Sequence, residues 1–265
     1  MRMKKIFGLL FVLAGAFTLA ACGEASNGQA NDGENVLELL SRAEATMADV
    51  DSMIMETEME MSMEIFGQPV DTTSTSRAYT VQLSPTELEM RIESVTETMG
   101  MEVPSTMYFK NGMVYMDMGE MQTKFELPIE EALQMANVRG FEFEFDEESI
   151  ISQSVSTNGD ERELQFVLDF TAMMDSLGGE LGAMMEMFGS MEMEEMFDGL
   201  TVDMTIVIDS DYQMISMTMA YEMELKGSAI DVKMTSTIVQ MGGVEITFPD
   251  NLDEFEEIDS AMMGF

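Results

Sequence analysis

The chain has 265 residues, with 51 Asp+Glu against 12 Lys+Arg, which gives a formal net charge of −39. It contains one Cys, no His and no Trp, so it has no Ser-His-Asp or Cys-His nucleophile system, no His-ligated metal and no internal disulfide. So acidic a chain repels phosphate backbones, and we expect no nucleic-acid partner. The hydrophobic fraction of 46% still predicts a folded domain with a core.

The first 22 residues have the pattern of an export signal. Arg2, Lys4 and Lys5 precede an uncharged run at 6–21, which is shorter than the roughly 20 apolar residues that span a bilayer. The run ends in Leu19-Ala20-Ala21-Cys22, which resembles the lipobox of bacterial lipoproteins. That resemblance implies a diacylglyceryl group on the Cys22 sulfur and cleavage before Cys22. The alternative is an ordinary secretory signal with a chance Cys.

These features divide the chain into a signal peptide at 1–21, a small and polar flexible tether at 22–34, and one domain at 35–265. Two or three acyl chains on Cys22 would anchor the protein stably, so we expect it at the cell membrane on the extracytoplasmic side. Cleavage removes three positive charges and no negative ones, which leaves a net charge of −42. Anionic headgroups repel such a surface, so the lipid must provide the attachment.

The domain is expected to open with an amphipathic helix. Asn35 is a suitable N-cap with Glu38 three residues later, and apolar residues then recur on one helical face: Val36, Leu39, Leu40, Ala43 and Met47. After Asp51 the period changes from 3.6 to 2: odd positions hold Met53, Met55, Met59, Met61, Met63 and Ile65, and even positions hold Glu56, Glu58, Glu60, Ser62 and Glu64. This alternation predicts a long strand with one apolar face and one wet face.

The remaining pattern predicts more strands and three further helical segments. Asn-Gly at 111–112 and the turn at 157–160 indicate hairpins. The other expected strands are 73–83, 88–93, 107–110, 113–116, 150–156, 161–168, 202–208, 215–225, 230–238 and a short one before Pro249; the expected helices are 128–136, 170–197 and 252–262. We therefore predict an α+β fold: a strongly curved antiparallel sheet, a half-barrel of about eight or nine strands, whose concave face is covered by the N-terminal and inserted helices.

This layout resembles the LolA-like half-barrel lipoproteins of the LppX and LprG type, and an uncharacterised Firmicutes lipoprotein family. The resemblance is carried by the lipobox, the tether, the opening helix, the hairpin at 108–115, the Asp-containing turn at 208–212 and the Ile-Thr-Phe-Pro at 246–249. It covers residues 35–255. It implies a hollow that holds acyl chains or the lipid moieties of lipoproteins.

Methionine supports such a role independently, because its unbranched, polarizable side chain repacks around varied apolar ligands. The cavity candidates are the inward residues of the first and later strands and those of the glycine-broken helices: Met55, Met59, Met61, Met63, Met173, Met184, Met185, Met217, Met219 and Met223. The alternative is that these residues fill a core in place of Leu.

Two kinds of metal site have partial support in the sequence. Met-x-Met pairs, as at 59–63, 116–118 and 191–193, are soft ligands for Cu(I), but the period of a strand already explains their spacing. The acidic run at 142–148 and the turn at 209–211 lack the pattern of an EF-hand loop. We expect no enzymatic activity, no cofactor and no bound metal. The expected function is binding of a hydrophobic or lipid ligand, as carrier or chaperone; the alternative is an envelope protein with a packed core that binds an unknown partner through its acidic surface.

Overall fold

A computed structural model describes most of the expected domain. The described residues are 35–65, 68–84, 86–119, 121–129, 132, 149–172, 199–225 and 228–258. The signal peptide, the tether with Cys22, most of the helix expected at 128–136 and nearly all of the one expected at 170–197 lie outside them. At 170–172 the chain enters a helical turn, and the Asp169 carboxylate accepts from Ala172 N at 3.0 Å.

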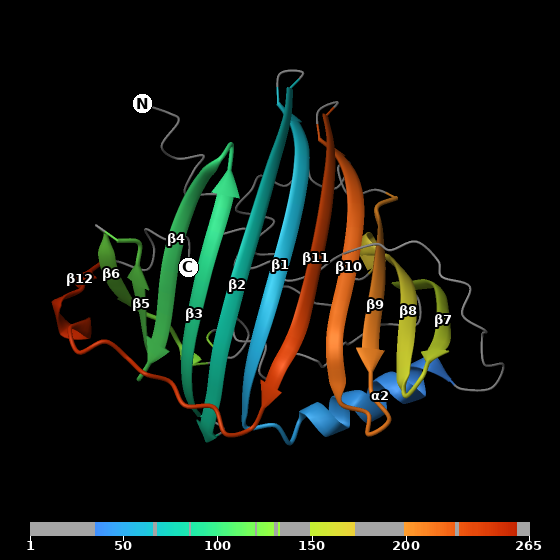
Figure 1. Cartoon of the computed structure of the whole chain (residues 1–265), viewed down its shortest axis with the longest axis horizontal. Helices are drawn as coiled ribbons and strands as arrows, with labels where there is room; N and C mark the ends of the chain where they lie inside the picture. Colours follow the sequence, from blue (N-terminus) through green and yellow to red (C-terminus); the bar gives the residue numbers. More distant parts are fainter. Residues whose placement is uncertain are drawn as a thin grey trace.

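All strands that the structure describes belong to one open sheet, in the order β12-β6-β5-β4-β3-β2-β1-β11-β10-β9-β8-β7. Every neighbouring pair is antiparallel except β12 and β6 (Figure 1). The strands are β1 (Ser52–Ile65), β2 (Gln68–Ser84), β3 (Glu87–Thr98), β4 (Met101–Lys110), β5 (Met113–Asp117), β6 (Gln122–Glu126), β7 (Ile150–Asn158), β8 (Glu161–Asp169), β9 (Thr201–Ile208), β10 (Met214–Leu225), β11 (Ser228–Met241) and β12 (Glu256–Glu257).

The single curved sheet agrees with a half-barrel, but the expected count of eight or nine strands is wrong, because the sheet has twelve. The protein is mostly β. The sequence pattern missed β6 and β12, which have five and two residues, because alternation over so few positions carries little signal. It also ended the third strand at 93 and began the next at 107, whereas β3 and β4 continue to a turn at Met99 and Gly100, both of which have positive φ.

The C-terminal part also differs from expectation. The helix expected at 252–262 is a single 3-10 turn, η2 (Leu252–Glu254), followed by β12, and residues 242–250 form no strand. Instead this segment crosses the outer side of the sheet, as Figure 1 shows. Phe248 contacts Tyr108 with ring centroids 6.0 Å apart, and Phe255 meets Tyr115 edge-on at 5.8 Å. Aromatic contacts and the pairing of β12 with β6 thus fix the C-terminal segment against the sheet.

The opening helix, α2 (Val36–Met47), is confirmed. Asn35 caps it by accepting from Leu37 N at 3.0 Å and from Glu38 N at 3.4 Å. The Glu38 carboxylate pairs with Arg42 one turn later and does not close a capping box. The five apolar residues of its predicted face are buried, and they pack in one cluster with side chains of β1 and β7–β10, including Leu164, Phe166, Met204 and Ile206. This cluster is the larger core.

A second, smaller core lies at the other end of the sheet. It is formed by side chains of β3, β4, β5 and β6 with residues that follow β6: Leu88, Met90, Phe109, Val114, Phe125, Leu127 and Ala132. The Asn111-Gly112 hairpin predicted from the sequence joins β4 to β5, with Gly112 at φ +75°. The central strands β11, β1 and β2 and the C-terminal half of β3 lie between the two cores.

Candidate functional site

Strand register defines two faces of the sheet. We call the face against which α2 packs the inner face. Met219 on β10 lies opposite Met234 on β11, which lies opposite Met59 on β1, and Met59 in turn lies opposite Ser74 on β2. Residues directly opposite in an antiparallel pair point to the same side. These pairs therefore place all four side chains on the inner face, and Glu56, Glu58 and Glu60 on the outer one.

The structure places the predicted methionines as follows. Met217 and Met219 are buried in the larger core, at 3% and 0% exposure. Met55, Met59, Met61, Met63 and Met223 lie on the inner face and are half-buried. Met173, Met184 and Met185 lie outside the described residues. The inner sides of β10, β11 and β1 thus form a surface rich in methionine, called here the methionine half, with part of each of these five side chains still accessible.

Next to the methionine half lies a group of hydroxyl side chains that sequence analysis did not single out. The hydroxyl patch consists of nine inner-face residues on β11, β1, β2, β3 and β4: Ser236, Thr57, Thr72, Ser74, Ser76, Ser94, Thr96, Thr98 and Ser105. One register row, Ser236-Thr57-Ser76-Ser94-Ser105, crosses all five strands with a hydroxyl at every position. The inner face is therefore divided between thioethers and hydroxyls.

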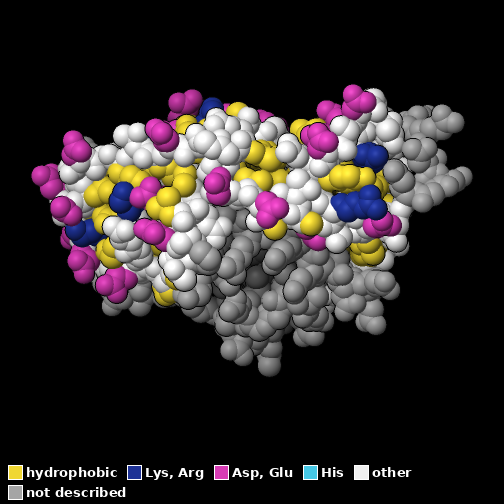
Figure 2. Space-filling view, turned by 90° about the horizontal axis from the view of Figure 1, so that it is seen from below, with side chains coloured by type: hydrophobic (Ala, Val, Ile, Leu, Met, Phe, Trp, Pro, Cys, Tyr) yellow, Lys and Arg dark blue, Asp and Glu magenta, His cyan; other side chains and the backbone are white. Residues whose placement is uncertain are grey.

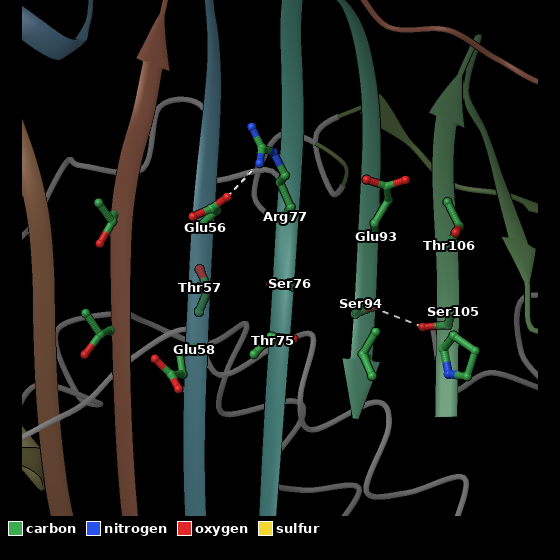
Figure 3. A pocket seen from close by; sticks show the side chains of 14 residues that line it. Glu56, Thr57, Glu58, Thr75, Ser76, Arg77, Glu93, Ser94, Ser105 and Thr106 are labelled. Atoms are coloured by element: carbon green, nitrogen blue, oxygen red, sulfur yellow. Dashed lines mark hydrogen bonds and ion pairs between the residues drawn. The ribbon is translucent and has the colours of Figure 1, made fainter. Parts of the chain in front are cut away.

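Most of these hydroxyls are paired with one another across strands. The oxygens of Thr57 and Ser236 are 3.0 Å apart, and those of Ser94 and Ser105 are 3.1 Å apart; Figure 3 marks the second pair. Two further pairs at 3.2 Å join Ser74 to Thr96 and Thr98 to Thr72. Eight of the nine hydroxyls in the patch therefore form hydrogen-bonded pairs between neighbouring strands. The sequence signal was the unbroken run of Thr and Ser from Thr72 to Ser76, which places hydroxyls on both faces of β2.

Tyr221 adds one polar group to the methionine half. It lies on the inner side of β10, opposite Val232, and is half-buried. Burial raises the pKa of its phenol, because the charged form is poorly solvated there. Among the described residues its hydroxyl has no hydrogen-bond partner. Burial likewise raises the pKa of Tyr108, which faces the C-terminal segment on the outer side.

Two shallow grooves in the described part of the chain lie on the outer face. One, of about 490 Å³, crosses β11 and β1–β4 behind the hydroxyl row, and Glu56, Glu58, Arg77 and Glu93 line it (Figure 3). The other, of about 390 Å³, is lined by side chains of β1, β2, β10 and β11, including Lys233. Both grooves are shallow and acidic, with an ion pair of 2.7 Å between Arg77 and Glu56 in the first.

The few basic residues are mostly held by aromatic rings. Five of the seven Lys and Arg side chains in the described ranges lie over a ring: Arg42 and Arg162 over Tyr212, Arg77 and Arg91 over Tyr79, and Lys110 over Phe248. Seen from below, most of the basic side chains lie toward the two ends of the molecule, while carboxylates are spread over the whole described face (Figure 2). The central inner face receives none of these cations.

The described ranges contain neither a metal site of acidic, His or Cys side chains nor a membrane-spanning helix. No group of three or more Asp, Glu, His or Cys side chains there could hold a metal ion. No helix among these residues has the length and apolarity to cross a bilayer. Of the Met-x-Met pairs, Met59, Met61 and Met63 share the inner face, whereas the pair at 191–193 lies outside the described part of the chain.

Comparisons with known proteins gave one family match. The profile of a family described as "Family of unknown function (DUF6612)" matches residues 35–254. No curated protein matches the chain. Matched solved structures include LprF from Mycobacterium bovis (10% identity, 81% of this chain and 96% of that one, TM-score 0.43), lipoprotein LppX from Mycobacterium tuberculosis (7%, 80% and 98%, 0.40) and a LolA superfamily protein from Nitrosomonas europaea (8%, 83% and 97%, 0.28). The group that the sequence layout resembles is thus among the structures found.

Proposed function

The chain belongs to the DUF6612 family, a family of unknown function, and we propose that it is a lipid-anchored extracytoplasmic lipoprotein that binds a hydrophobic or lipid ligand on the inner face of its sheet. It acts there as a carrier or chaperone and not as an enzyme. One observation carries the proposal: five inner-face methionines keep part of their surface accessible, with Met55 and Met223 packed against the edge of the larger core and Met59, Met61 and Met63 beyond it, while Met217 and Met219 are fully packed. Accessible thioethers on a concave sheet are suited to an apolar ligand of variable shape.

The anchor follows from the lipobox at 19–22 and can be tested separately. Cells fed with labelled palmitate should incorporate the label into the protein at Cys22. The variant Cys22→Ser should carry no label and should keep its signal peptide, because cleavage before Cys22 follows acylation. A label that persists in Cys22→Ser would show that the acyl chains are attached elsewhere or that the signal is not a lipobox.

Ligand binding can be tested with diphenylhexatriene, an apolar dye that fluoresces in a dry site. The mature chain from residue 22, with Cys22→Ser so that it is not acylated, should bind it saturably without detergent. Met61→Asp places a carboxylate on the inner face and should weaken binding at least tenfold, because the charge would lose water without gaining a partner. Thr73→Asp is the matched control, since Thr73 is exposed on the outer face of β2. Absence of saturable binding, or equal losses in both variants, would contradict the proposal.

A second candidate is favoured by the two outer-face grooves: an envelope protein that binds a partner through its acidic face. In that case diphenylhexatriene would not bind. Instead, neutralising the first groove with Glu58→Gln and Glu93→Gln would remove cross-links to the partner on intact cells. A Cu(I) role through Met59, Met61 and Met63 predicts binding tighter than micromolar to the His-free mature chain, which a competition titration measures.

A further inference from the structure

We propose that the ligand is a neutral lipid that bears hydroxyl or ester groups, and that its uncharged polar group binds inside the half-barrel, on the hydroxyl patch, while its chain lies on the methionine half. This inference rests on the proposed function and adds to it the chemical class of the ligand and its orientation. A ligand that enters only with its hydrocarbon chain, and leaves its polar group in water, would need an inner face of apolar side chains alone.

The hydroxyl patch retains hydrogen-bonding capacity after its internal bonds are made. A hydroxyl has one hydrogen and two acceptor sites, so two paired hydroxyls use one hydrogen and keep the other. The four pairs therefore leave four hydroxyl hydrogens. Ser76 lies in the middle of the row and makes no bond to another side chain within the described ranges. Tyr221 contributes one more donor beside the methionine half.

The burial of these residues shows which of them a ligand can reach. Thr72 and Ser236 are buried, whereas Ser74, Ser76, Ser94, Thr96, Thr98 and Ser105 are half-buried. A hydrocarbon chain laid over half-buried hydroxyls would remove their water and offer no hydrogen bond in return, which is unfavourable. A glycerol, ester or sugar group replaces that water with acceptors and donors. The patch on β2, β3 and β4 spans about 10 Å at ordinary strand spacing, which fits one such group.

The absence of charge on the same surface decides between neutral and ionic lipids. On the inner sides of β11, β1, β2, β3 and β4 the register places apolar side chains, hydroxyls and the amides of Gln68 and Gln82 near the two ends of β2, and no charged side chain. A phosphate or carboxylate bound there would be desolvated without a cation, inside a chain of net charge −39. A neutral polar group avoids both penalties.

The boundary between the two surfaces sets the orientation. Met59 and Met61 on β1 lie directly opposite Ser74 and Thr72 on β2. Opposite residues have Cβ atoms about 5 Å apart, so thioether and hydroxyl side chains meet along the line between β1 and β2. A lipid that lies across the strands along these rows therefore has its chain over β1, β11 and β10, and its polar group over β2 and β3, where Ser74 pairs with Thr96 and Thr72 with Thr98.

The test compares three probes of equal chain length on the mature Cys22→Ser chain, which starts at residue 22: 1-oleoylglycerol, 1-octadecene and oleate, each displacing diphenylhexatriene. We expect 1-oleoylglycerol to bind at least tenfold more tightly than the other two. In the variant Ser74→Ala, Ser94→Ala, Thr96→Val its affinity should fall about tenfold, since a few hydrogen bonds are lost, while 1-octadecene should bind equally or better. The matched control is Thr75→Val with Thr106→Val on the outer face, which should change neither.

Each result has a distinct meaning. If oleate or 1-octadecene binds the wild-type chain as tightly as 1-oleoylglycerol, or if the triple variant weakens all three probes alike, the assignment of a neutral polar group is overturned while lipid binding stands. If no probe displaces the dye and the dye itself does not bind, both this inference and the proposed function fail. Should the triple variant not fold, Ser94→Ala alone gives a smaller effect of the same sign, and the wild-type comparison of probes decides the question without any variant.

Discussion

Truncating two methionines of the same face separates packing from recognition. Met219 is 0% exposed and lies between Met204 and Met234, which are 1% and 2% exposed. Met219→Ala removes three heavy atoms from a closed core, which costs about 2–5 kcal/mol. For a domain of this size a loss of 1 kcal/mol lowers Tm by about 2–4 °C, so the expected decrease lies between about 4 and 20 °C.

Met61 is half-buried and lies in the next inward-facing register row after that of Met219, so Met61→Ala removes only part of a buried surface and leaves no closed cavity. The expected cost is about 1 kcal/mol or less, and Tm should fall by no more than about 4 °C. Binding should respond in the opposite order: Met61→Ala weakens diphenylhexatriene binding, and Met219→Ala leaves it nearly unchanged at temperatures where the variant is folded. Calorimetry and dye titration measure the two effects. Equal destabilisation by both substitutions would show that Met61 is also packed and would refute the reasoning.

Three further predictions concern the fold. Asn35→Ala removes the cap of α2 and should lower the free energy of unfolding by about 1 kcal/mol, measured by urea titration, with the exposed Asn158→Ala as control. The pKa of Tyr221 is raised by burial, so the folded state holds its proton more tightly than the unfolded state; its stabilising effect is complete below the unfolded pKa of about 10 and is lost as pH rises through the folded pKa. Tyr221→Phe should therefore lose less of its free energy of unfolding between pH 9 and 11 than the wild type does. Identical pH profiles of the two proteins would contradict this. Added NaCl should raise Tm by screening the self-repulsion of a chain with net charge −39; a Tm that does not rise would contradict this explanation of the charge.

Much of the fold could be predicted because local patterns agree with it. The cap at Asn35, the apolar face of α2 and the Met-Glu alternation of β1 each follow from side-chain periodicity, and Asn111-Gly112 marks its hairpin. Short strands and the C-terminal segment were missed because their positions depend on long-range contacts, such as those of Phe248 and Phe255. Local propensity carries little information about such contacts.

The candidate site was predicted only in part. The alternation identified the inward methionines, but it did not separate the packed Met219 from the accessible Met61, because burial depends on what lies against each side chain. The hydroxyl patch depends on register: Ser76, Ser94 and Ser105 form one row only because β2, β3 and β4 pair as they do. A shift of one residue in that pairing would turn the hydroxyls to the outer face.

The most direct test of the account is the mass of the protein taken from its own membrane. Native mass spectrometry of the acylated chain should show a second species, heavier than the protein with its Cys22 anchor by the mass of one lipid, and extraction should release that lipid as a neutral, hydroxyl- or ester-bearing molecule at about one per chain. Met61→Asp should lose the heavier species, and Thr73→Asp should keep it. A wild-type chain that carries only its own covalent anchor, from its own membrane and under conditions that preserve known lipid complexes, would contradict the proposed function.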